Sequence, residues 1–379
     1  MSIRREWRSF DYILLILVIS YALFGIFMIG AAASYTTLKT VAGAYAGQKL
    51  YLPTGLVILA MITIVDYHFI SRFYWFIYAC MLILLLLVMV MGKNDVSGTA
   101  RWFRFGGITI QPSEFSKIFM IVFLAKFIDK QQKSINNISI LFILAALIII
   151  PVLLIKLQPA LSSCLVIAAI SVCMLFSSDL KFRYILIALL VIAPIVFVFF
   201  WDLQNKDRLI IDKVLGTYQV KRIDTFRKLE IDSDDNGESY QTNKSITSIA
   251  SGMMEGKGYK NGSYIPMGQN DFIFSVIGEQ FGFIGCTCAL FVVFVIIGKC
   301  ILIANRAQDM LGKLIAMGVA GKLAFEVVIN VCVATRLVPN TGMPFPFLSS
   351  GGSSMWVNMA SIGLVLNVGL FKAKSIFKG

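Results

Sequence analysis

The stretch Ile138-Ser-Ile-Leu-Phe-Ile-Leu-Ala-Ala-Leu-Ile-Ile-Ile-Pro-Val-Leu-Leu-Ile155 contains 18 residues and no charge. A helix that crosses the hydrocarbon core of a bilayer needs about 20 mostly apolar residues, so this stretch predicts a membrane span. Comparable apolar runs recur along the chain, at 11–31, 50–65, 73–91, 112–128, 138–156, 160–177, 183–201, 272–304, 313–335 and 354–371. The pattern predicts an all-α integral membrane protein with about ten transmembrane helices, in a single polytopic domain over residues 1–379.

The composition excludes several other classes of protein. Apolar residues make up 58% of the chain and charged residues 15%, whereas a soluble domain carries about 25% charged residues. These proportions exclude a soluble enzyme, a disordered chain and a disulfide-rich secreted domain, and the uninterrupted runs exclude an outer-membrane barrel. The net charge of +13 is scattered in small groups between the runs, so we expect no nucleic-acid partner. His68 is the single histidine, which excludes a histidine-based metal site.

The positions of Lys and Arg predict the orientation of the chain in the membrane. With the N-terminus inside the cell, 15 Lys and Arg residues lie at the cytoplasmic ends of the runs, against nine in the short outer loops and span interiors. Positive residues favour the cytoplasmic side of a membrane. Both termini are therefore predicted to be cytoplasmic.

Residues 202–271 break the apolar pattern, because 30% of them are charged against about 11% of the rest of the chain. We expect them to form one large extracellular loop before span eight. Apolar side chains recur in this loop at helical spacing, at Val220, Ile223, Phe226 and Leu229. Four cationic residues lie among them: Lys221, Arg222, Arg227 and Lys228. The stripe predicts an amphipathic helix over about 218–230 that lies on the membrane surface, with its Lys and Arg at lipid headgroups. A solvated helix packed on its own protein is the alternative.

A polar segment at the predicted outer mouth of spans three and four contains candidate anion ligands. Arg101 can hold a phosphate through two parallel hydrogen bonds. Further along, Gln111-Pro-Ser-Glu-Phe-Ser-Lys117 places Glu114 and Lys117 three residues apart on one helical face. We expect these two side chains to pair inside the membrane, with Glu114 orienting Lys117 toward an anionic substrate. Interfacial snorkelling of Arg and Trp side chains is the alternative.

Asp271 is the last charged residue before a long apolar run and lies at the predicted outer boundary of the membrane. Partial desolvation raises the pKa of such a carboxyl group toward that of a general base. A helix N-cap is the alternative role, because Asp is favoured there. The motifs Tyr240-Gln-x-x-Lys-Ser245 and Gly256-Lys-Gly258 precede it and add polar groups on the same side.

Residues 339–354 contain three prolines and three glycines, which exclude a regular element. Ser353 and Ser354 open the last predicted span, where free backbone N–H groups form an anion site, with simple capping as the alternative. In the ninth run, Lys322 and Glu326 stand four residues apart in apolar surroundings. We expect a structural ion pair there, because an isolated charge in a membrane is costly. The alternative is that the pair lines a polar cavity and, with Glu279, tunes the field around Asp271.

Six motifs follow one another along the chain. They are Ala100-Arg-Trp102, Gln111-Pro-Ser-Glu-x-x-Lys117, Tyr240-Gln-x-x-Lys-Ser245, Gly256-Lys-Gly258, Asp271-Phe-Ile-Phe-Ser-Val-Ile277 and the Thr341-Gly…Pro346-Phe…Ser350-Gly-Gly-Ser-Ser354 run. In this order they resemble the SEDS (shape, elongation, division and sporulation) family, which includes RodA, FtsW and SpoVE, over about residues 10–371. The stretch Gln280-Phe-Gly-Phe-Ile-Gly285 favours the RodA branch.

The resemblance implies a peptidoglycan glycosyltransferase in the bacterial cytoplasmic membrane, serving cell elongation, shape or division. Such an enzyme polymerises lipid II, an undecaprenyl-linked disaccharide peptide, at the outer face, with inversion at the sugar and loss of undecaprenyl diphosphate. The family's catalytic aspartate falls on Asp271, and the usual partner is a class B penicillin-binding protein. The candidate substrate-binding residues are Arg101, Gln111, Glu114, Lys117, Lys244, Ser245, Lys257, Ser353 and Ser354. No ligand motif implies a metal, and a need for a divalent cation stays open.

The chain departs from the family pattern at several positions. Ala160 stands where the family has an Asp, Gln269-Asn270 where it often has His-Thr, and Gln280 where it has a second Glu. The missing carboxylate at Ala160 keeps open a non-catalytic membrane scaffold that activates a transpeptidase. A lipid II flippase is a further alternative, because buried charges suit a polar substrate path. Against it, the chain shows no internal repeat, and the polar motifs cluster on one side of the membrane.

Overall fold

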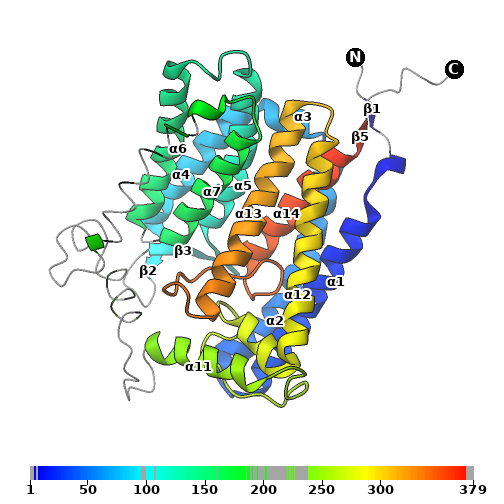
Figure 1. The fold of residues 1–379 in the computed structure, drawn as a ribbon, viewed down its shortest axis with the longest axis vertical. Coiled ribbons are helices and arrows are strands. Elements are labelled where there is room, and N and C mark those ends of the chain that lie inside the picture. Colours follow the sequence, from blue (N-terminus) through cyan, green and yellow to red (C-terminus); the bar gives the residue numbers. More distant parts are fainter. Residues whose placement is uncertain are drawn as a thin grey trace.

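The structure is a computed structural model that describes residues 4–372 except 6, 95–99, 106–107, 159 and most of 185–237. Within that last range it describes only 186, 187, 190, 194, 201, 202, 220, 222, 224 and 226. The described chain is mostly helical (Figure 1). Its helices are α1 (Tyr12–Ser34), α2 (Lys39–Ile64), α3 (Tyr67–Arg72), α4 (Tyr74–Met91), α5 (Pro112–Lys130), α6 (Ile138–Leu157), α7 (Leu161–Phe176), α11 (Glu238–Ser251), α12 (Ile273–Asn305), α13 (Met310–Ala334) and α14 (Gly352–Gly369). The strands are β1 (Arg4–Arg5), β2 (Lys93–Asn94), β3 (Ala100–Phe105), β4 (Ile108–Ile110) and β5 (Phe371–Lys372).

Six of the described helices are long and apolar enough to cross a membrane, which confirms the predicted helical membrane architecture. They are α1, α2 from Thr40, α4, α6, α12 and α13. The runs predicted at 112–128, 160–177 and 354–371 form α5, α7 and α14. The run at 183–201 lies almost wholly outside the described residues, so the count of ten spans and the side of each loop stay predictions.

The two ends of the described chain lie side by side. Strand β1 pairs antiparallel with β5, with Arg4 opposite Lys372 and Arg5 opposite Phe371. Figure 1 shows this pair at one end of the bundle and α11 at the opposite end.

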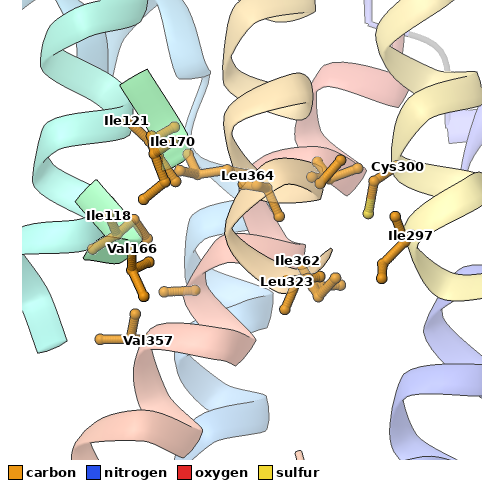
Figure 2. Close-up of a cluster of buried hydrophobic side chains, with 14 of the residues drawn as sticks. Ile118, Ile121, Val166, Ile170, Ile297, Cys300, Leu323, Val357, Ile362 and Leu364 are labelled. Atoms are coloured by element: carbon orange, nitrogen blue, oxygen red, sulfur yellow. The ribbon is translucent and has the colours of Figure 1, made fainter. Parts of the chain in front are cut away.

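The centre of the bundle is formed by α5, α13 and α14, whose side chains are buried on nearly every face. Figure 2 shows apolar side chains from five helices meeting there: Ile118 and Ile121 of α5, Val166 and Ile170 of α7, Ile297 and Cys300 of α12, Leu323 of α13, and Val357, Ile362 and Leu364 of α14. The outer helices α1, α4 and α6 instead expose large apolar side chains such as Ile16, Val90 and Phe142. Such an apolar exterior is what hydrocarbon surroundings require.

Helix α12 is broken at Gly282, whose backbone has φ 61° and ψ −159°. The break separates a short helix, Ile273–Phe281, from the longer remainder. It also frees backbone groups that would stay unpaired at membrane depth, where each unsatisfied group costs several kcal/mol. Residues 252–263, here called the strap, bond to these groups. The pairs are Lys257 N to Glu279 O, Gly258 N to Gln280 O, Phe283 N to Met253 O and Ile284 N to Met254 O, at 2.8–3.1 Å.

Glycines allow the strap to lie against the short helix. A Cβ at Gly252 would be 1.9 Å from the carbonyl oxygen of Gly278, and one at Gly256 would be 2.2 Å from that of Gln280. Gly256 also has a positive φ of 84°. The Gly256-Lys-Gly258 motif therefore has a backbone role, which the sequence analysis did not foresee.

We expect Gly252→Ala to lower the free energy of unfolding by at least about 1–3 kcal/mol, because the added methyl group meets backbone that cannot move aside. Thermal unfolding of the purified protein in detergent measures this. The control is Gly298→Ala on α12, where an added Cβ meets nothing within 4 Å. Equal melting temperatures for the two variants would contradict the role given to the strap.

Candidate functional site

Asp271 lies in the turn just before α12, and tertiary hydrogen bonds hold this turn in place. The Asn330 side chain of α13 donates to the Asp271 carbonyl at 2.9 Å and to the Met343 carbonyl at 2.7 Å. The Ser349 hydroxyl contacts the Asn270 carbonyl at 2.5 Å, and the Ser350 N–H donates to the Gln269 carbonyl at 2.8 Å. Asn330 is fully buried. These bonds join the Asp271 turn to the irregular segment 339–351.

The Asp271 side chain does not cap a helix. The N-cap of α12 is Phe272, and it makes no side-chain capping bond. The N-cap alternative for Asp271 is therefore wrong, and its half-buried carboxylate is available for another role.

Arg222 is the charged group that the structure brings toward Asp271. Its Nη1 donates to the Asn340 carbonyl at 2.8 Å. A Cβ placed on Gly342 would lie 3.6 Å from this Nη1 and 3.7 Å from Asp271 Oδ2, so the guanidinium and the carboxylate face the same point. Burial raises the pKa of the Asp271 carboxyl group to about 6, and the positive charge of Arg222 opposes the rise.

Sequence reasoning did not find this role for Arg222. It placed Arg222 with the cationic residues that face lipid headgroups, whereas the side chain bonds to the loop after α13. The backbone at 220, 222, 224 and 226 is helical. Ile223 and Leu229 of the predicted stripe lie outside the described residues, so the surface helix over 218–230 stays a prediction. No local signal could have found a contact between residues 118 positions apart.

A second polar group is a chain of four charged side chains inside the bundle. Lys117 of α5 contacts Glu114 Oε1 at 2.5 Å and Glu326 Oε1 at 2.8 Å. Glu326 of α13 also contacts Lys322 at 3.0 Å, and Lys322 donates to Asn358 Oδ1 of α14 at 2.5 Å. These contacts confirm both predicted pairs and join them into one network. Every ammonium in it has a carboxylate within hydrogen-bond distance.

Three further candidates lie around this network. Ser354 accepts a bond from Asn358 at 3.4 Å, and the Ser353 hydroxyl accepts one from the Gln111 N–H at 2.9 Å. The structure thus brings Gln111 and the two serines together, at the starts of α5 and α14. The Lys117 ammonium lies between the carboxylates of Glu114 and Glu326. Substrate binding by Gln111, Ser353, Ser354, Glu114 and Lys117 stays a prediction.

The candidates on the strap and α11 make contacts within the protein. The Lys257 ammonium contacts Glu279 Oε1 at 2.8 Å, and Glu279 also accepts from the Ser263 N–H and hydroxyl. The Ser245 hydroxyl is buried between the Ser275 hydroxyl and the Ala334 carbonyl. Glu279 therefore ties the strap to the short helix that follows Asp271. Substrate binding by Lys257 and Ser245 stays a prediction.

Two candidates are half-buried outside the groups described above. Arg101 is half-buried on β3, which pairs with β2 and β4, and Lys244 is half-buried on α11. Their roles stay predictions. Ala160 precedes α7 without a capping side chain, and the neighbouring Gln158 donates to the Leu85 carbonyl at 2.9 Å. Within the described part of the chain, no group of three or more His, Cys, Asp or Glu side chains is placed to hold a metal ion.

Comparison with known proteins places the chain in a family. The FtsW/RodA/SpoVE model, described as a cell cycle protein family, matches residues 11–374. The chain belongs to this family. A curated relative from Trichlorobacter lovleyi, named "Probable peptidoglycan glycosyltransferase FtsW", is 34% identical over 378 residues, covering 97% of this chain and 95% of the relative.

Solved structures show the same fold in this family. One, described as "Structural coordination of polymerization and crosslinking by a peptidoglycan synthase complex", has a TM-score of 0.78 and 26% identity, covering 96% of this chain and 98% of that one. The crystal structure of the rod shape determining protein RodA of Thermus thermophilus has a TM-score of 0.69 and 25% identity, covering 96% and 97%. Similar proteins thus carry both the FtsW and the RodA name, and the RodA branch stays a prediction.

We expect Glu326→Gln to lower the free energy of unfolding by about 3–5 kcal/mol, because it leaves the buried Lys322 ammonium without a carboxylate and the network with one uncompensated positive charge. The control is Asp129→Asn, which breaks the partly exposed Lys126–Asp129 pair on α5 and should cost no more than about 1 kcal/mol. Thermal unfolding in detergent compares the two. A smaller loss for Glu326→Gln than for Asp129→Asn would contradict the structural role of the network.

Proposed function

We propose that this chain, a peptidoglycan glycosyltransferase by family, polymerises lipid II at the outer face of the bacterial cytoplasmic membrane with Asp271 as its general base. The observation that carries the proposal is the half-buried Asp271 carboxylate, which caps no helix and faces Arg222 across Gly342. The name of the FtsW relative supports the reaction. The similar structure of a complex for polymerization and crosslinking supports a class B penicillin-binding protein as partner.

The proposed reaction needs one base and cations. The 4-hydroxyl of an acceptor sugar attacks C1 of the donor sugar, and its proton passes to the Asp271 carboxylate. The bond between C1 and the diphosphate oxygen breaks, and undecaprenyl diphosphate leaves with the electron pair. A diphosphate is a stable anion, so no acid has to protonate it, and cationic side chains such as Arg101 are proposed to hold it.

The environment of Asp271 suits a base at neutral pH. A pKa of about 6 leaves the carboxyl group mostly ionised at pH 7, yet makes it a better proton acceptor than an exposed aspartate. The hydrogen bonds of Asn330 and Ser349 fix the turn that carries it. A non-catalytic scaffold would not polymerise lipid II, so polymerisation by the wild-type protein separates the two functions, and the Asp271 variant then tests the base.

We expect Asp271→Asn to reduce the rate of lipid II polymerisation by ~10²-fold or more, because the amide keeps the size of the side chain but cannot accept the proton. Gel analysis of glycan strands made from labelled lipid II by the purified protein, with a penicillin-binding partner, measures the rate. Glu255→Gln removes an exposed carboxylate on the strap and should leave the rate unchanged. A near-normal polymerisation rate in a folded Asp271→Asn protein would contradict the proposal.

The pKa of Asp271 predicts a pH dependence. Below pH 6 the carboxyl group is increasingly protonated and cannot take the proton, so the polymerisation rate should fall about tenfold per pH unit. Above pH 6 the rate should level off. The rate measured from pH 5 to 8 checks this, and the residual rate of Asp271→Asn should lack this acid limb. A flat wild-type profile down to pH 5 would argue against Asp271 as the base.

A further inference from the structure

Gly342 leaves a small open space between two charged side chains. An atom placed at its missing Cβ would lie 3.6 and 3.8 Å from Arg222 Nη1 and Nη2, and 3.7 Å from Asp271 Oδ2. Beyond Gly342 and its chain neighbours, no other described heavy atom is closer to that point. Any other residue at this position would put its side chain there. An atom at this point would therefore be in ordinary contact with both a guanidinium and a carboxylate.

The turn that contains Gly342 is held by its own hydrogen bonds. The Gly342 N–H donates to the Asn340 side-chain oxygen at 2.9 Å, and Gly342 has a φ of 68°. The Asn340 carbonyl accepts the bond from Arg222. Beside Gly342, the Thr341 hydroxyl is buried and has no hydrogen-bond partner among the described residues. One short turn thus sets the position of the guanidinium and keeps the space open.

The charges around the space select the group that fits it. The carboxylate accepts hydrogen bonds and the guanidinium donates them. An ammonium group can only donate, so Arg222 would repel it, and a phosphate can only accept, so Asp271 would repel it. A hydroxyl group does both, and it carries no charge. The two side chains are therefore matched to a sugar hydroxyl and not to the diphosphate.

We propose that Arg222 and Gly342 form, with Asp271, the subsite that receives the attacking hydroxyl of the acceptor sugar. This inference rests on the proposed function of Asp271. The hydroxyl donates to Asp271 and accepts from Arg222. As its proton moves to the carboxylate and its oxygen bonds to C1 of the donor, the guanidinium stabilises the negative charge that develops on that oxygen. The diphosphate leaves from the other side of C1 and is held elsewhere.

Gly342→Ala tests the space directly, because its methyl group would stand between Arg222 and Asp271, where the hydroxyl must approach. We expect the polymerisation rate to fall by ~10²-fold, while the affinity for lipid II, measured by binding of a fluorescent analogue, changes less than about twofold. Gly258→Ala is the matched control for backbone strain. Gly258 also has a positive φ, of 92°, and its missing Cβ faces only the Asn261 side chain. This control should keep its rate.

Arg222 variants separate the charge from the geometry. Arg222→Gln should slow polymerisation about tenfold or more, because the guanidinium is lost. It should also raise the midpoint of the acid limb, the pH at which the polymerisation rate falls to half its plateau, by about one unit, because an opposite charge beside Asp271 is lost. Arg222→Lys should return the midpoint toward the wild-type value but not the rate, since an ammonium lacks the planar fork. Arg336→Gln is the control, because this arginine bonds instead to Asn243 of α11 at 2.7 Å. It should leave the midpoint unchanged.

The outcomes distinguish the subsite from the function on which it rests. If Asp271→Asn is inactive while Gly342→Ala or Arg222→Gln polymerises at the wild-type rate, the subsite is wrong and the base stands. If Asp271→Asn is itself active, the proposed function fails first. Thermal unfolding of every variant identifies misfolding. Should Gly342→Ala alone fail to fold, the two Arg222 variants decide: an unchanged rate and midpoint in Arg222→Gln overturns the subsite.

Discussion

The buried ion network between α5 and α13 is the interaction on which the rest of the bundle depends. Lys117 and Lys322 are each only 1% exposed, and hydrocarbon surroundings would expel either charge if it were alone. Glu326 lies between the two ammonium groups, and Lys322 reaches on to Asn358 of α14. The network therefore favours one register of the three central helices, because a shift between α5 and α13 breaks the Lys117–Glu326 contact and a shift of α14 removes Asn358 from Lys322. Exchanging Lys322 and Glu326 would preserve an isolated ion pair. In this network, the exchange would place a lysine at position 326, next to the Lys117 ammonium.

The irregular segments at the α11 end provide hydrogen-bond partners for freed backbone groups, as the ion network provides partners for buried charges. The break at Gly282 frees peptide groups in α12, and the strap pairs with them through Lys257, Gly258, Met253 and Met254. Glu279 then ties the strap to the short helix that follows Asp271. A helix that ran straight through residue 282 would need none of these contacts. The break therefore lets loop residues hold the short helix from the side.

The candidate site depends on both the central helices and the irregular segments at the α11 end. Asn330 projects from α13, one turn beyond Glu326, and holds both the Asp271 turn and the segment that contains Met343. Arg222 reaches the same segment from a remote part of the chain. Asp271 is thus positioned by α13 and the segment 339–351 in addition to its own turn. Such support on rigid elements is what a general base requires, since proton transfer depends on placement at hydrogen-bond distance.

The sequence by itself determined the features that depend on local pattern. The apolar runs predicted the helices, and the spacings of three and four residues predicted the Glu114–Lys117 and Lys322–Glu326 pairs, because helical geometry alone brings such residues together. The boundary position of Asp271 marked it as the candidate base. Helix α2 was predicted too short, since its first turns, from Lys39, carry polar and small residues that an apolar run does not include.

Only the tertiary structure decided which distant groups meet. Lys117 and Glu326 are 209 positions apart, and nothing in either motif shows that one carboxylate serves two lysines. The backbone role of Gly256, the contact of Lys257 with Glu279 and the approach of Arg222 to Asp271 depend in the same way on how helices and loops pack. Local sequence sets which groups can bond. Packing sets which bonds form, because a buried polar group takes whatever partner the fold brings within reach.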